Sequence, residues 1–128
     1  MEPKFSKTVS SQMESAAKEA YPCECCGILV GTRSKDEVEF VEAREVPNQI
    51  QGVLKNAHFV IDPLYLYQVE KELESRSLEI VGFYHSHPNC KAILSDEDIK
   101  YMVPGLVYTI LSVTTQGVVD IKNYTRNL

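Results

Sequence analysis

The sequence has no long hydrophobic run and no excess of positive charge, and each absence removes a class of function. No segment holds the roughly 18 consecutive apolar residues of a membrane-spanning helix, and the N-terminus lacks the basic and then apolar regions of a secretory signal. The sequence has 13 Lys and Arg residues and 18 Asp and Glu residues, which gives a net charge of -5, and the basic residues form no stripe. Phosphate backbones would therefore be repelled on average. We expect a cytoplasmic protein that binds neither nucleic acid nor membranes.

Internal repeats and low-complexity stretches are also missing, so neither a repeat array nor a disordered chain is expected. The 128 residues fall within the range of about 100–200 residues for one domain and leave too little length for a second core. The hydrophobic share of 44% and the charged share of 24% are ordinary for a globular protein. We expect residues 1–128 to form a single domain.

The cysteines are few and unevenly placed, at Cys23, Cys25, Cys26 and Cys90. In a cytoplasmic protein they are expected to be mostly reduced, and three of them are too crowded for a disulfide framework. A redox pair of Cys23 and Cys26 is one alternative, but such pairs gain a low thiol pKa at a helix N-terminus and this pair leads into a strand. The same pair matches half of a zinc deaminase signature, but the other half, H-x-E, does not precede it. For Cys90 we expect packing as a small apolar side chain.

Hydrophobic periodicity predicts an alternation of helices and strands. Helical spacing and capping signals predict helices over residues 6–20, over 63–76 with Asp62 as N-cap, and from Ser95 to Pro104. Apolar runs predict a hairpin from Cys26 to Val46, a short strand over 58–61 after a loop at 47–56, and strands over 78–84, 106–113 and 118–124. This order predicts an α/β fold in which a single mixed β-sheet is sandwiched or flanked by helices.

Two histidines follow the apolar run 78–84 and carry the strongest chemical signal. Side chains at i and i+2 of an extended chain lie on the same side, so His85 and His87 can share one metal ion. A hydrolytic zinc site needs three protein ligands and an open position for water, and Asp98, on the first turn of the next predicted helix, is the best third candidate. Ser95-x-x-Asp98 is also a capping box, which implies no catalysis.

Both halves occur together in the pattern His85-x-His87-x7-Ser95-x2-Asp98. At this spacing the sequence resembles the JAMM (MPN-plus) metalloprotease family, whose motif is a glutamate, then His-Ser/Thr-His-Pro, then Ser-x-x-Asp. The resemblance implies the JAMM/MPN fold, which is cytidine-deaminase-like.

The resemblance extends to both sides of the histidines and covers about residues 10–115. The segment 21–31 is similar to the family segment that places a catalytic glutamate before a glycine-rich strand, and this assigns that role to Glu24. The segment 58–63 is similar to a strand-to-helix junction of the family. His58 is a further candidate for a ligand or a substrate contact, but a histidine at the end of a strand is more often structural.

The resemblance also implies a mechanism. One zinc ion would be held by His85, His87 and Asp98 and would lower the pKa of a catalytic water from about 15.7 to about 7. Glu24 would take a proton from this water and hand it to the leaving amine, and Ser95 would donate a hydrogen bond to the oxyanion.

The implied substrates are proteins. The family cleaves peptide or isopeptide bonds after the Gly-Gly tail of ubiquitin-like or sulfur-carrier proteins, and a chain of 128 residues is most similar to its small prokaryotic type. Two other functions remain open. One is a catalytically silent MPN-type interaction module, and the other is a metal hydrolase that shares only the His-x-His strand. Because no ligand position is missing, the motif favours the enzyme.

Overall fold

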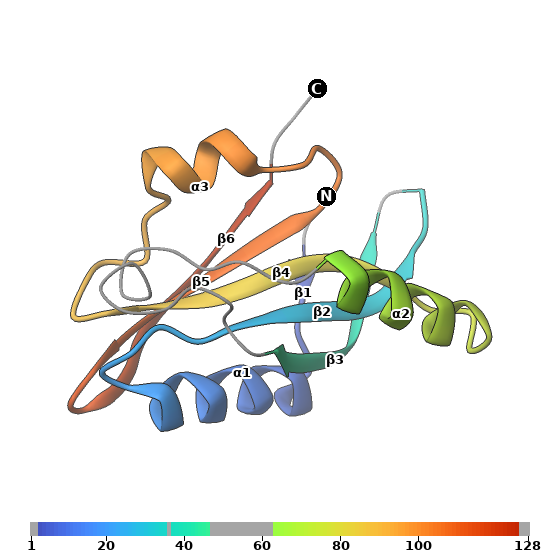
Figure 1. The fold of residues 1–128 in the computed structure, drawn as a ribbon. Coiled ribbons are helices and arrows are strands. Elements are labelled where there is room, and N and C mark those ends of the chain that lie inside the picture. Colours follow the sequence, from blue (N-terminus) through green and yellow to red (C-terminus); the bar gives the residue numbers. More distant parts are fainter. Residues whose placement is uncertain (1–2, 36, 47–62, 126–128) are drawn as a thin grey trace.

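The computed structural model describes residues 3–35, 37–46 and 63–125. Within these residues, three helices and six strands follow one another as β1 (Pro3–Lys4), α1 (Lys7–Ala20), β2 (Cys26–Arg33), β3 (Val38–Val46), α2 (Pro63–Glu74), β4 (Glu79–Pro88), α3 (Asp96–Tyr101), β5 (Val107–Thr114) and β6 (Gly117–Thr125). The strands form one sheet in the order β1-β3-β2-β4-β5-β6 (Figure 1). The pairs β1–β3 and β4–β5 are parallel and the other pairs are antiparallel, so the sheet is mixed.

Helix α1 covers one face of the sheet because its apolar residues recur at helical spacing. Ser6 caps its N-terminus, and the Ser6 hydroxyl accepts a hydrogen bond from the Val9 amide at 3.2 Å. The buried stripe of α1 consists of Val9, Met13, Ala16 and Ala17. This stripe packs in one core cluster with Leu29 of β2, Tyr84 of β4 and Leu111 of β5. The expected first helix and its inward stripe are confirmed.

Helix α2 covers the opposite face. Its buried residues Val69 and Leu73 pack against Ile28 and Val30 of β2. Side chains alternate between the two faces of a strand, so Leu29 faces α1 while its two neighbours face α2. The sheet is therefore sandwiched between helices, which confirms the expected fold class and explains why the middle of β2 is apolar at every position.

Strand β4 is longer than the sequence predicts. The expected strand ends at Tyr84, which is fully buried, whereas β4 continues to Pro88. The added length comes from parallel pairing with β5, in which His85 pairs with Ile110 and His87 with Ser112. His85 and His87, the two histidine candidates for metal ligands, therefore lie on a paired strand in the interior of the sheet.

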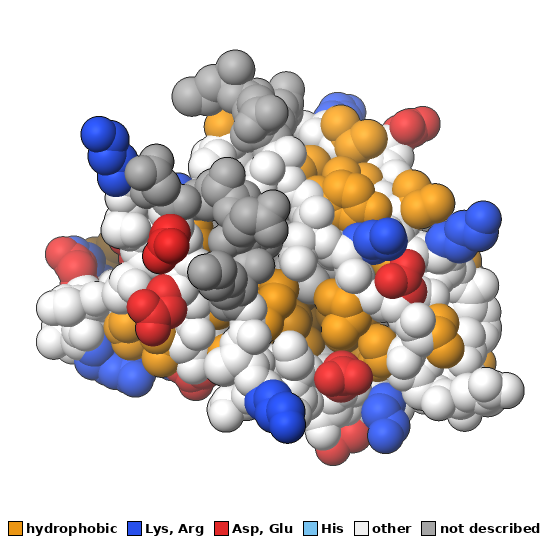
Figure 2. Space-filling view, turned by 180° about the vertical axis from the view of Figure 1, so that it is seen from behind, with side chains coloured by type: hydrophobic (Ala, Val, Ile, Leu, Met, Phe, Trp, Pro, Cys, Tyr) orange, Lys and Arg blue, Asp and Glu red, His pale blue; other side chains and the backbone are white. Residues whose placement is uncertain are grey.

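Some expectations lie outside the described residues, namely the loop over 47–56, the strand over 58–61, the role of His58 and the cap at Asp62. Among the described helices, none is long and apolar enough to cross a membrane. On the face shown in Figure 2, Lys and Arg side chains are interspersed with Asp and Glu side chains and form no basic stripe.

Candidate metal centre

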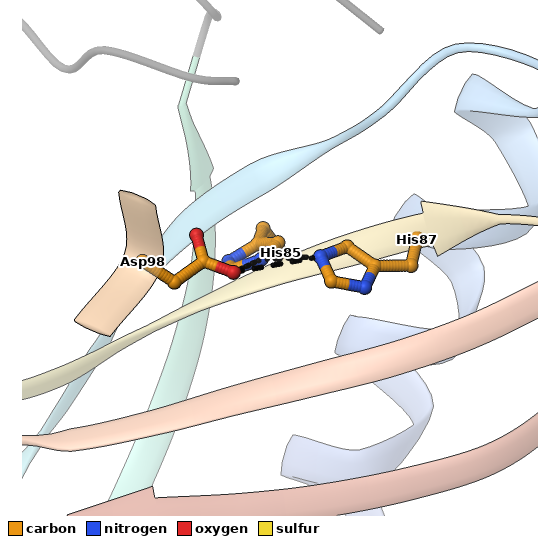
Figure 3. Close-up of side chains that lie close together, drawn as sticks. All are labelled: His85, His87 and Asp98. Atoms are coloured by element: carbon orange, nitrogen blue, oxygen red, sulfur yellow. Dashed lines mark hydrogen bonds and ion pairs between the residues drawn. The ribbon is translucent and has the colours of Figure 1, made fainter. Parts of the chain in front are cut away.

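The three ligand candidates converge on one point (Figure 3). The Nε2 atoms of His85 and His87 lie 3.0 Å apart. The Oδ2 atom of Asp98 lies 3.6 Å from the first of these nitrogens and 3.7 Å from the second. A tetrahedral zinc ion with bonds of about 2.0–2.1 Å requires ligand atoms roughly 3.3–3.4 Å apart. The three atoms therefore fit three corners of such a tetrahedron, and within the described part of the chain they are the one group of this kind.

The backbone of β4 sets the direction of the two imidazoles. Tyr84 faces α1, so His85 and His87 face the other side of the sheet. The Nδ1 atom of His87 lies 3.1 Å from the carbonyl oxygen of Lys91. A donor at Nδ1 leaves the lone pair on Nε2, the atom that faces the other two ligands. The contact with Lys91 thus selects the tautomer that a metal ion needs.

The loop between the histidines and α3 is held by contacts from distant residues. The Asn89 amide donates to the Val113 carbonyl at 2.7 Å, and the Tyr21 hydroxyl donates to the Asn89 side chain at 2.9 Å. Another tyrosine, Tyr124 of β6, donates to the carbonyl of the buried Ala92 at 2.6 Å. Sequence reasoning missed these contacts, because no local pattern links α1 or β6 to this loop.

Cys90 lies in the same loop and corrects one expectation. Its side chain is exposed, so the predicted role as a small packed apolar residue is wrong. The backbone of Cys90 supplies the useful contact, since its carbonyl accepts from the Ser112 hydroxyl at 2.5 Å. The carbonyl is thus hydrogen-bonded to β5, while the side chain of Cys90 is exposed.

Ser95 and Asp98 form the predicted capping box at the start of α3. The Ser95 hydroxyl accepts from the Asp98 amide at 3.0 Å, and Asp98 Oδ2 accepts from the Ser95 amide at 2.9 Å. The same Oδ2 atom faces the two histidines. The capping interpretation and the ligand interpretation are therefore compatible, because one carboxylate oxygen serves both contacts.

Opposing effects act on the ionisation of the ligands. Burial works to raise the pKa of Asp98, but the hydrogen bond and charge of His85 and the contacts of Ser95 outweigh it and hold that pKa below its usual range. Burial and, second, the charge of His85 lower the pKa of His87. An ionised carboxylate and a neutral imidazole are the forms that bind zinc.

Glu24 immediately precedes the segment that pairs with the histidines. In the antiparallel register of β2 and β4, Cys26 lies opposite His85, and the preceding segment with Glu24 stays beside the histidine strand, where the Ser86 amide donates to the Cys25 carbonyl at 3.0 Å. The Glu24 side chain is only 5% exposed. Burial first, and the charge of Asp98 second, raise the pKa of Glu24 from 4.5 to about 8. A carboxyl group with a pKa in this range can exchange a proton near neutral pH.

The two buried cysteines beside Glu24 lack the surroundings of a reactive redox pair. Burial is the largest effect on both buried thiols, and it raises the pKa of Cys25 to about 11 and that of Cys26 to about 12. A reactive redox pair requires the opposite shift. All four cysteines are free in the structure.

Several known proteins are similar to this chain in sequence. The family model described as prokaryotic homologs of the JAB domain matches residues 6–126. A desampylase of Haloferax volcanii is 32% identical over 105 residues, which cover 81% of this chain and 72% of the relative. A desampylase of Pyrococcus furiosus is 30% identical over 79 residues, 62% of this chain. A probable TtuB-protein conjugate cleaving protease of Thermus thermophilus is 34% identical over 96 residues, 68% of this chain. The matches span 51% of the Pyrococcus relative and 56% of the Thermus relative.

Two solved structures give the same picture. A protein of Desulfitobacterium hafniense has a TM-score of 0.73 at 26% identity, with 96% of this chain and 92% of the other covered. A JAB1/MPN domain protein of Archaeoglobus fulgidus has a TM-score of 0.62 at 25% identity, with 98% and 89% covered. Because the family model matches nearly the whole length of this chain, the chain belongs to the prokaryotic homologs of the JAB domain, a small prokaryotic type of the JAMM/MPN family.

Proposed function

We propose that the chain is a zinc-dependent hydrolase that cleaves peptide or isopeptide bonds after the Gly-Gly tail of ubiquitin-like or sulfur-carrier proteins. The observation that carries this proposal is the convergence of His85, His87 and Asp98 at distances that fit one ion, with the buried Glu24 close enough for the charge of Asp98 to raise its pKa. Relatives named as desampylases and as a conjugate cleaving protease support the same class of reaction.

In this proposal each residue has a separate task. His85, His87 and Asp98 would hold the ion, which when bound would act as a Lewis acid toward water and a carbonyl group. Glu24 accepts a proton from the attacking water and passes it to the leaving nitrogen. Its burial supports this role, because a carboxyl group away from bulk solvent does not lose the proton to water before the leaving group takes it.

Ser95 is proposed to stabilise negative charge on the substrate. Its hydroxyl oxygen accepts from the Asp98 amide, which leaves its proton free to be donated to another group. One such donor is worth on the order of 3 kcal/mol in the transition state of acyl transfer.

A protein substrate is supported by the surface beside Asp98. Large apolar side chains are exposed there, with Ile99 following Asp98 on α3 at 48% and Ile93 in the preceding loop at 57%. These exposed apolar side chains are available to pack against a protein partner. A catalytically silent interaction module would use such a surface equally well, so activity must be tested directly.

The first prediction concerns the ligands. Replacement of His85, His87 or Asp98 with Ala should abolish zinc retention, because a three-ligand site has no spare donor. Zinc per chain is measured after dialysis, and circular dichroism shows that each variant is folded. Asp96→Ala, which removes an exposed carboxylate from the same helix, is the matched control and should keep one zinc. Stoichiometric zinc in Asp98→Ala would show that the third ligand is another residue, with His58 tested next.

The second prediction separates metal binding from proton transfer. Glu24→Gln keeps the size of the side chain and removes its basicity, so zinc should stay bound while turnover falls roughly 10²–10⁴-fold. Glu19→Gln changes an exposed carboxylate near the end of α1 and should leave turnover unchanged. A rate near that of the wild type in Glu24→Gln would reject the proposed role.

The metal-free protein gives an independent measure of the same residue. Folding raises the pKa of Glu24 from 4.5 to about 8, so protonation favours the folded state. This contribution is complete below pH 4.5 and is lost as the pH rises through about 8. Chemical unfolding of the metal-free protein should therefore show a decline in stability over this window that Glu24→Gln lacks.

The third prediction tests Ser95 as a donor against Ser95 as a helix cap. Ser95→Ala removes both functions and should cost about 0.5–2 kcal/mol of stability, whereas Gly at an N-cap costs only a few tenths. Ser95→Gly should therefore unfold nearly as the wild type does and still lose about 10²–10³-fold in kcat. Normal kcat in Ser95→Gly would leave Ser95 with the capping role alone.

The fourth prediction concerns the substrate. An extended tail that adds to a strand needs small side chains wherever the walls are close, and glycine fits that need. Fusions of a ubiquitin-like or sulfur-carrier protein that end in Gly-Gly-X (carrier fusions) should be cleaved. The matched Gly-Val-X fusions should be cleaved much more slowly. Cleavage is followed by gel and mass spectrometry, with unstructured casein as the third substrate. Equal cleavage of all three would show a general peptidase, and no cleavage by the zinc-loaded protein would favour the silent module.

A further inference from the structure

Ser86 lies between the two histidines and points to the other side of the sheet. Its side chain is fully buried, and it occupies the face of β4 that packs toward α1. It therefore cannot coordinate an ion that lies between His85 and His87, and the proposed mechanism leaves it without a role.

The hydroxyl of Ser86 interrupts the regular pairing of β2 with β4. Cys25 lies opposite Ser86 in the register that pairs Cys26 with His85. The Ser86 amide donates to the Cys25 carbonyl at 3.0 Å, as expected for an antiparallel pair. A regular pair would direct the Cys25 amide back to the Ser86 carbonyl, but this amide donates to the Ser86 hydroxyl at 2.8 Å. A side chain thus replaces one main-chain acceptor at the end of the ladder.

This substitution fixes the segment that carries Glu24. The Cys25 amide nitrogen belongs to the peptide group that follows Glu24, so an acceptor for that nitrogen sets the orientation of the peptide plane. The strand β2 begins at the next residue, Cys26. The hydrogen bond between Cys25 and Ser86 is therefore the last connection between the histidine strand and the backbone of Glu24, and it joins residues 61 positions apart in the sequence.

We propose that Ser86 is a positioning residue, whose hydroxyl holds the Cys25 amide and thereby places the Glu24 carboxyl against the metal centre. This inference rests on the proposed function, since Glu24 must act on the water there. A misplacement of about 1 Å can cost roughly 10²-fold in rate even when the groups themselves are intact. The hydroxyl of Ser86 thus contributes to catalysis without touching substrate or metal.

The fifth prediction compares Ser86→Ala with Ser86→Thr. Ser86→Ala should keep one zinc per chain, lose roughly 10–100-fold in kcat and change KM little, because it disturbs proton transfer and leaves binding intact. Ser86→Thr restores the oxygen and should recover most of the rate. Ser86→Cys fills the space of the serine side chain but offers only a weak acceptor, so it should repeat the loss without a cavity.

The thiol of Cys25 provides the matched control. The Ser86 hydroxyl is also hydrogen-bonded to this thiol, so a loss in Ser86→Ala has two candidate causes. Cys25→Ala removes the thiol and keeps the backbone amide. If the amide contact is the one that matters, Cys25→Ala should have a kcat near that of the wild type. A loss equal to that of Ser86→Ala would overturn the inference.

Amide hydrogen exchange reads the same contact without turnover. The Cys25 amide should exchange about 10-fold or more faster in Ser86→Ala than in Ser86→Thr, because its acceptor is gone. Unchanged exchange, or wild-type kcat in Ser86→Ala, overturns the role of Ser86 while the zinc hydrolase stands. A wild-type protein that binds zinc and cleaves no carrier fusion overturns the proposed function instead, so the two failures are distinguishable.

Discussion

The antiparallel pairing of β2 with β4 is the constraint on which the rest of the structure depends. It sets the register that places Cys26 opposite His85 and thereby brings the start of β2 to the histidines. It also decides which residues face α1 and which face α2, because a shift by one residue would exchange the two faces. The side chain of Tyr84 would then face α2, and those of His85 and His87 would face α1. Core packing and site geometry are for this reason one problem in this fold.

The site separates two carboxyl groups by their surroundings. Asp98 is held in the ionised form by His85 and by the capping contacts of Ser95, whereas Glu24 is pushed toward the neutral form by burial and by the charge of Asp98. Pairs of carboxyl groups whose pKa values move in opposite directions are typical of sites that need one permanent anion and one proton carrier. The negative charge of Asp98 therefore interacts with His85 and also raises the pKa of Glu24.

Local sequence signals were sufficient for the helices, the hairpin and the grouping of the three ligand candidates. Ser6 and Ser95 mark helix starts, the alternation in β3 marks a strand, and the spacing of the histidines defines a strand face. Partners far apart in the chain were not predictable in the same way. The extension of β4 requires β5, and the exposure of Cys90 follows from how the loop is held. The role of Ser86 depends on a backbone amide in another strand, and a backbone group leaves no signature in the sequence.

The spacing of the ligands has a consequence for how the site is assembled. All three ligand candidates come from residues 85–98, one short stretch that leads from β4 into α3. Little conformational entropy is therefore lost when they are brought together. The proton carrier comes from the other side of the long β2–β4 closure. The three ligand candidates therefore meet through a short chain closure, whereas Glu24 reaches them only through a long one. In the proposed enzyme, the pairing of β2 with β4 is thus the step that completes the site.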